Sequence, residues 1–196
     1  MKKLIAMIMA LAMVLALTAC GGNSGDTPDA SANDTPAVVA ESAVEILEKV
    51  WATYAEDEKF PPMGGNSEAV NWEAPASFSL EAAEELTYLL YLPADQIANV
   101  DDCASLIHAM NQNTFTCGVF HVADAANVQA VVDALKGNIS TAQWMCGFPD
   151  KMIISVVGGD YIVSAFGNAE IMDNFQSKLA AQYGESVTVA VEENLA

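Results

Sequence analysis

Cysteine and histidine side chains are the most reactive groups that this sequence offers. The chain has four cysteines and two histidines among its 196 residues. Thiolate sulfur and imidazole nitrogen are preferred zinc ligands, and the same groups act as nucleophile and base in thiol-dependent enzymes. Beyond Cys20, the residues of this kind are Cys103, His108, Cys117, His121 and Cys146.

The spacing of these groups does not suit a zinc site. If Cys117 and His121 lie on one strand, they share a face but stand about 13 Å apart, at roughly 3.3 Å per residue. One zinc ion, with ligand bonds of about 2.0–2.3 Å, does not bridge that separation. If the segment from Cys103 to His108 is helical, its two ends point about 140° apart around the axis. We therefore predict no metal ligands and no cofactor; the alternative that Cys146 joins one member of each pair stays open.

Cys20 has a chemistry of its own, set by the residues before it. Two lysines and an unbroken apolar run of fourteen residues, 4–17, open the chain. The run is shorter than the roughly 20 residues of a membrane-spanning helix and is typical of a signal peptide. Leu17-Thr18-Ala19-Cys20 resembles the lipobox of bacterial lipoproteins, which implies cleavage before Cys20 and a diacylglyceryl group on its thiol. We expect residues 1–19 to be a signal peptide and the mature chain to be lipid-anchored on the extracytoplasmic face of the cell membrane.

A single disulfide is possible in the exported part, because such a protein meets an oxidising compartment. Three cysteines remain once Cys20 carries a lipid, so at most one pair forms. The preferred pair is Cys117 with Cys146. The alternative is that the cysteines fill core positions as small apolar residues.

The segment Trp144-Met145-Cys146-Gly147-Phe148-Pro149 resembles the thioredoxin active site. It lacks the second cysteine of the C-x-x-C motif, which resolves a mixed disulfide. We therefore favour a structured loop held in place by Trp144 and Phe148. The sequence contains no G-x-S-x-G, H-E-x-x-H or P-loop motif, and it identifies no catalytic residues.

Composition changes sharply after the signal peptide. Residues 21–40 are Gly, Asn, Ser, Asp, Thr, Pro and Ala with almost no large apolar side chain, so we expect 20–40 to be the lipidated cysteine and a flexible linker. Residues 41–196 are long enough for a single domain with its own core.

The chain is strongly acidic. It carries 26 Asp and Glu against 7 Lys and Arg, a formal net charge of −19, and all of the basic residues are lysines. This balance argues against nucleic acid and phosphorylated ligands, because the bidentate anion recognition of arginine is missing. The partners we expect are the membrane, through the lipid anchor, and an envelope protein.

Two helices are predicted early in the domain. Ser42 and Glu45 form a capping box, and an apolar stripe at helical spacing follows as far as Tyr54. A second helix is predicted to start at Ser79 and to stop at Pro93.

The remaining sequence predicts one unit twice. Residues 104–111 and 114–122 are predicted as paired strands, followed by a helix that Asp124 caps and Gly137 ends. Residues 152–157 and 161–166 are predicted as a hairpin, followed by a helix that Asn168 caps and Gly184 ends.

These patterns predict an α+β domain with a largely antiparallel sheet. It is built from two strand–strand–helix units with additional N-terminal helices, and residues 187–191 add a last short strand. The strands of the second hairpin are apolar almost throughout, which indicates that both sheet faces are covered. We expect the two later helices to cover one face and the two early helices part of the other.

The stretch from about Ser79 to the C-terminus resembles a family of uncharacterised domains in Gram-positive lipoproteins. The resemblance is carried by Val157-Gly158-Gly159-Asp160-Tyr161-Ile162-Val163 and the capped helix after it. It implies the fold and the location. The family has no established activity, so it implies no functional residue.

We therefore expect a membrane-tethered, non-enzymatic binding or accessory module. The alternatives are a thiol-dependent or carboxylate-dependent envelope enzyme and a metal-binding lipoprotein.

Overall fold

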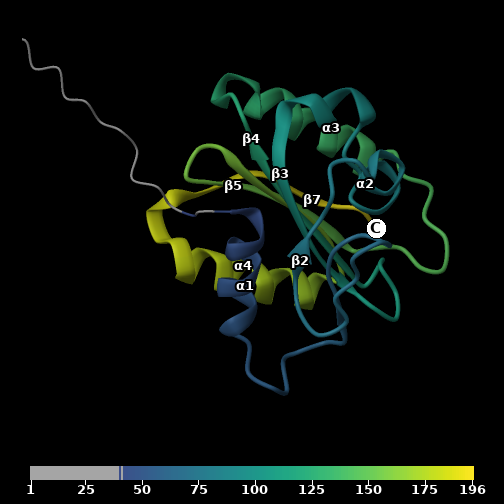
Figure 1. Ribbon diagram of the computed structural model, residues 1–196. Helices are drawn as coiled ribbons and strands as arrows, with labels where there is room; N and C mark the ends of the chain where they lie inside the picture. The colour runs from purple at the N-terminus through teal and green to yellow at the C-terminus, as the bar shows by residue number, and fades with distance from the viewer. Residues whose placement is uncertain (1–39, 41) are drawn as a thin grey trace, which may run out of the picture. The chain divides into compact units, whose positions relative to one another are not determined.

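An antiparallel sheet organises residues 40 and 42–196, which are the residues described by the computed structural model (Figure 1). Its strands are β1 (Pro62–Met63), β2 (Ala76–Ser77), β3 (Val100–His108), β4 (Phe115–Val122), β5 (Lys151–Val157), β6 (Tyr161–Gly167) and β7 (Val187–Asn194). They lie in the order β1-β3-β4-β6-β5-β7, and β2 also pairs with β3. Each pairing is antiparallel. The predicted signal peptide, Cys20 and nearly all of the predicted linker lie outside the described residues.

Four α-helices pack on this sheet in the described part of the chain. They are α1 (Ala43–Ala52), α2 (Ala83–Leu89), α3 (Val128–Ser140) and α4 (Ala169–Tyr183). Three short 3₁₀ turns accompany them: η1 (Ala94–Asn99), η2 (Ala125–Asn127) and η3 (Gly184–Ser186). The predicted α+β class, with a largely antiparallel sheet, is confirmed. No helix of the described residues is long and apolar enough to cross a bilayer.

The first helix begins where its cap predicts. The Ser42 hydroxyl accepts from the backbone N–H of Glu45 at 3.3 Å, which satisfies one of the unpaired donors of the first turn. A second donor there, the N–H of Ala43, bonds the Asp102 carboxylate of β3 at 2.6 Å. The helix is thus capped locally and tied to the sheet.

The strand–strand–helix unit does occur twice, as β3-β4-α3 and β5-β6-α4. Gly158 and Gly159 adopt φ of 67° and 96° in the turn between β5 and β6, a conformation that glycine takes without steric cost. α3 differs from its prediction because it begins after η2 and runs past Gly137 to Ser140. Ile139 is fully buried, so core packing holds the last turn beyond the predicted glycine stop.

The predicted second helix is shorter at its start than its pattern suggested. The Ser79 hydroxyl accepts from the N–H of Glu81 at 3.2 Å, which makes a local turn, and α2 begins only at Ala83. Serine favours such turns over helix interiors because its hydroxyl competes for backbone donors.

Both faces of the sheet are covered, but the helices divide between them differently from the prediction. α1 and α4 pack on one face, and α2 and α3 pack on the other (Figure 1). The expectation that the two later helices share one face is therefore wrong. β5 and β6 contribute apolar side chains to both clusters, so their sequences offer α3 and α4 equally suitable surfaces.

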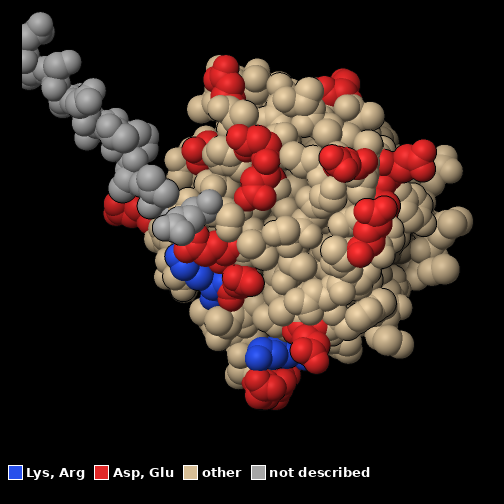
Figure 2. All heavy atoms as spheres, viewed as in Figure 1, with Lys and Arg blue, Asp and Glu red and all other residues tan. Residues whose placement is uncertain are grey.

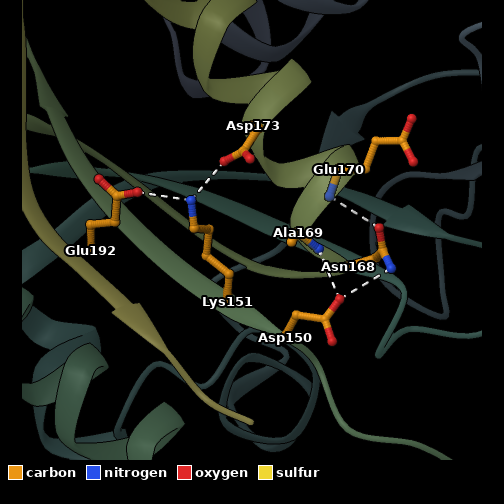
Figure 3. A network of polar contacts seen from close by, with 7 residues as sticks. All are labelled: Asp150, Lys151, Asn168, Ala169, Glu170, Asp173 and Glu192. Carbon is orange, nitrogen blue, oxygen red and sulfur yellow. Dashed lines mark hydrogen bonds and ion pairs between the residues drawn. The ribbon is translucent and has the colours of Figure 1, made fainter.

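A polar network closes the end of the second unit where β5 begins (Figure 3). The Lys151 ammonium lies 2.6 Å from the Asp173 carboxylate of α4 and 2.8 Å from the Glu192 carboxylate of β7. These charge-assisted bonds raise the pKa of Lys151, and the bond to Asp173 has the largest effect. Asn168 caps α4 by accepting from the N–H of Glu170 at 3.1 Å, and Asp150 accepts from the Asn168 side chain at 3.1 Å.

We predict that the second hairpin contributes strongly to stability. Ile154 and Val163 are 0% and 2% exposed and face opposite sides of the sheet. Replacing either residue with alanine should lower the free energy of unfolding by about 2–4 kcal/mol, through lost burial and cavity formation. Urea titration measures this cost. The control Val189→Ala on β7, where valine is 46% exposed, should cost less than about 0.5 kcal/mol. Costs below about 1 kcal/mol at both buried sites would contradict the prediction that this hairpin contributes strongly to stability.

Candidate functional site

A recess of about 420 Å³ opens where the β3–β4 hairpin meets the loop between α3 and β5. It is lined by Met63, by Tyr88 and Tyr91 near α2, and by residues 107–113 and 143–146. Four segments far apart in the sequence therefore build it. A smaller hollow of about 140 Å³ adjoins the recess and shares Asn111 and Asn113 with it.

Asparagine side chains of the hairpin hold the loop that forms one wall. Asn113 is 6% exposed, and its amide nitrogen donates to the carbonyls of Met145 at 2.7 Å and Gly147 at 2.9 Å. The amide nitrogen of Asn111 donates to the carbonyl of Cys146 at 3.2 Å. Three successive carbonyls of the loop are thus fixed from the hairpin side, which defines the shape of the recess.

Aromatic packing holds the same loop from its other side. The Trp144 ring lies 5.0 Å from the Phe166 ring and 5.4 Å from the Tyr91 ring, centroid to centroid. The Tyr91 and Phe166 rings meet edge to face at 5.2 Å. The sequence prediction that Trp144 holds this loop in place agrees with this packing. The same prediction for Phe148 is wrong, since that side chain is 70% exposed.

Two residues of the recess adopt a strained backbone. Tyr91 has a φ of 58° and Cys146 a φ of 65°, and they are the two non-glycine residues with positive φ in the described part of the chain. A left-handed conformation costs a residue with a side chain on the order of 1–3 kcal/mol and tends to occur at functional sites. Both such residues line this one recess, which marks it as the candidate site.

The lining carries no charge among the described residues, although the protein is strongly acidic. Figure 2 shows carboxylates spread over the face that it draws, with few basic side chains among them. Burial raises the pKa of the Tyr91 hydroxyl, which therefore stays protonated. Burial also lowers the pKa of His108, so its imidazole is neutral at pH 7.

The hydrogen bonds of His108 determine what this neutral ring can do. The backbone N–H of Met110 donates to its Nδ1 at 3.3 Å, and the ring stacks on Phe60 with centroids 5.3 Å apart. Because Nδ1 accepts, the ring hydrogen of the neutral form is on Nε2. His108 is therefore a hydrogen-bond donor and is poorly placed to act as a base toward a thiol.

The structure brings together two of the five thiol and imidazole residues singled out by sequence. His108 and Cys146 line the recess. Cys103 and Cys117 are buried on opposite faces of the sheet, and burial raises the pKa of both thiols. His121 lies at the opposite end of β4, where its Nδ1 contacts Asp101 and its Nε2 lies 3.6 Å from Asp160.

The predicted disulfide between Cys117 and Cys146 is not formed in the structure. All three cysteines of the described residues are free. Cys117 points into the core between the sheet and α1 and α4, while Cys146 is exposed in a loop that Trp144 anchors to the opposite face. The sheet itself separates the two thiols. Within residues 40 and 42–196, no group of three or more Cys, His, Asp or Glu is arranged to hold a metal ion.

Most of the recess was not anticipated from sequence. Tyr88, Tyr91 and Gln143 stood out in no motif, and Asn111 and Asn113 were predicted only as part of a strand and its turn. The strand predicted to run to residue 111 ends at His108 in the structure. Residues 109–114 form a loop in which the N–H of Thr114 donates to the carbonyl of Asn111 at 3.0 Å. The cluster of amide side chains at 111–113 is the signal that could have indicated a site.

No family model matches the chain, and no curated protein or solved structure matches it. The resemblance to domains of Gram-positive lipoproteins therefore stays a prediction.

We predict that Asn113→Ala loosens the wall of the recess. The substitution leaves the carbonyls of Met145 and Gly147 without their donor, which should cost about 1–3 kcal/mol. Amide hydrogen exchange in residues 143–148 should accelerate by about five-fold or more, because local opening becomes easier. The matched control is Gln112→Ala, which removes a neighbouring amide whose side chain makes no hydrogen bond within the described residues. Equal exchange in the two variants would show that Asn113 does not hold the loop.

Proposed function

We propose that this chain is a lipid-anchored module of the cell envelope that binds an envelope component in the recess. The anchor is supported by the N-terminal sequence, in which the apolar run 4–17 leads to Leu17-Thr18-Ala19-Cys20. Removal of the signal peptide and lipidation of Cys20 would leave the domain on the extracytoplasmic face of the membrane, joined by a linker of about twenty residues. Such a linker has a typical reach of about 25 Å as a random coil.

The observation that carries the proposal is the paired strain of Tyr91 and Cys146 around one recess. Surface segments without a role have no need to hold two residues in left-handed conformations around one recess. Here the hydrogen bonds from Asn113 and the packing of Trp144 hold the segment that carries Cys146, and Tyr91 packs on the same Trp144 ring. The result is a recess that is already shaped before any ligand arrives. Preorganisation of this kind lowers the entropic cost of binding.

Binding without chemistry fits this site better than a thiol-dependent reaction. A nucleophilic thiol is ordinarily activated by an adjacent base. His108 is the imidazole that shares the recess with Cys146, and its Nδ1 is occupied by a backbone donor. The described lining contains no carboxylate that could act as a base instead.

One experiment tests both parts of the proposal. Tyr88 is replaced by photoreactive benzoylphenylalanine in the full chain, which is produced in living Gram-positive cells fed a clickable fatty acid. The chain should carry the fatty acid, and illumination should yield a crosslinked adduct with envelope material. The matched control places the same photoreactive residue at Trp72, which is 63% exposed and lies outside the recess, against 68% for Tyr88. This control should give no adduct.

Two results would contradict the proposal. Fatty-acid label retained on a Cys20→Ala chain would mean that the anchor lies elsewhere, since this variant should stay unlipidated and unprocessed. Equal crosslinking from positions 72 and 88 would mean that the recess is not the binding site.

A further inference from the structure

We infer that the recess takes an uncharged oligosaccharide. This inference deepens the proposed function and rests on it, because it names the ligand class of the same site.

The charge of the lining excludes strongly ionic ligands. A buried or half-buried ionic group requires a partner of opposite charge, and the lining offers neither a carboxylate nor an ammonium group among the described residues. The five lysines of residues 40 and 42–196 all lie in ion pairs with carboxylates. Since the net charge of −19 also repels anions, the ligand that fits is neutral.

The aromatic side chains suit the apolar face of a sugar ring. Tyr91 and Trp144 form a fixed wall against Phe166, and Tyr88 is 68% exposed at the rim. The axial C–H groups of a pyranose form a flat apolar patch that can pack on such rings, while its hydroxyls stay at the edge. Tyrosine and tryptophan are suited to this arrangement because each combines an apolar face with a polar tip.

Amide side chains supply the matching polar groups. Gln112 and Gln143 line the recess, and their side chains make no hydrogen bond within the described residues. An amide both donates and accepts, as a sugar hydroxyl does. The Nε2 hydrogen of His108 adds a donor, since Nδ1 of that ring already accepts from the backbone.

An extended peptide is the other neutral ligand to consider, and the strands beside the recess do not favour it. Extended peptides commonly bind by pairing with an exposed sheet edge. At this end of the sheet β1 covers the edge of β3, with Pro62 opposite His108 and Met63 opposite Ile107. On its other side β3 pairs with β4, which pairs with β6. The outer edge here is β1 itself, which is only two residues long and begins with a proline that has no N–H to donate, so it offers little for an extended peptide to pair with.

The site is built to hold a glycan and not to cleave it. Glycoside hydrolysis ordinarily uses a pair of carboxyl groups on either side of the bond. No described residue that lines the recess is Asp or Glu. Asp150 belongs to the adjoining hollow, where its carboxylate accepts from the N–H of Ala169 at 3.0 Å and helps to cap α4.

Calorimetric titration of the full chain tests the inference. The chain is kept in a polyoxyethylene detergent, because a glycosidic detergent would itself present sugar. The neutral probes are N-acetylchitotetraose and cellotetraose, and tetragalacturonate is the anionic comparator. At least one neutral probe should bind with a Kd in the millimolar range or tighter, and tetragalacturonate should bind at least roughly ten-fold more weakly.

Variants then locate the binding. Tyr88→Ala should weaken the neutral probe roughly ten-fold and Gln143→Ala about three-fold or more, through lost ring contact and lost hydrogen bonds. The matched control Trp72→Ala removes an aromatic ring of similar exposure outside the recess and should change the Kd by less than about two-fold. Equal effects of Tyr88→Ala and Trp72→Ala would overturn the inference.

A blocked, uncharged peptide of alanine and serine distinguishes failure of the ligand class from failure of the proposed function. If this peptide binds with dependence on Tyr88 and no neutral glycan does, the oligosaccharide inference is wrong while the recess remains a binding site. If position 88 also yields no crosslink on cells, the proposed function fails with it.

Discussion

The structure depends on burying both faces of the central strands. β5 and β6 carry apolar side chains on each side, and a sheet of this kind is stable only between two layers that exclude water. One early and one late helix supply each layer. With the faces covered in this way, the strand ends are where side chains and loops remain accessible, and the recess opens at one of these ends.

Two separate segments around the recess hold strained backbone in a fixed shape: Tyr91 follows α2, and Cys146 lies in the loop between α3 and β5. Left-handed backbone at Tyr91 and Cys146 costs on the order of 1–3 kcal/mol for each residue. The two hydrogen bonds from Asn113 and the packing of Trp144 on Phe166 oppose this cost. A buried amide that lost both acceptors would cost a comparable amount, so the loop remains in its strained form. The same contacts leave the Cys146 thiol exposed and away from Cys117.

Local signals of the sequence predicted the elements well but not their assembly. Ser42, Asn168 and the glycine pair 158–159 each dictate backbone geometry within a few residues, and the helices and the hairpin follow from them. The choice of sheet face could not be predicted, because strands that are apolar on both sides give each helix two equivalent surfaces. The recess could not be predicted for a related reason. Its walls come from Met63, Tyr88, Tyr91 and residues 107–113 and 143–146, and no local pattern of the sequence shows that these segments meet.

We infer that this uncharged recess is the place where a ligand binds. Amide chemical shifts of the isotope-labelled full chain, followed during addition of N-acetylchitotetraose, show where the ligand binds. We expect the largest shift changes in residues 88–91, 107–113 and 143–147, with little change around His121 at the far end of β4. Changes centred on His121 or on β7, or no saturable change at millimolar sugar, would contradict it.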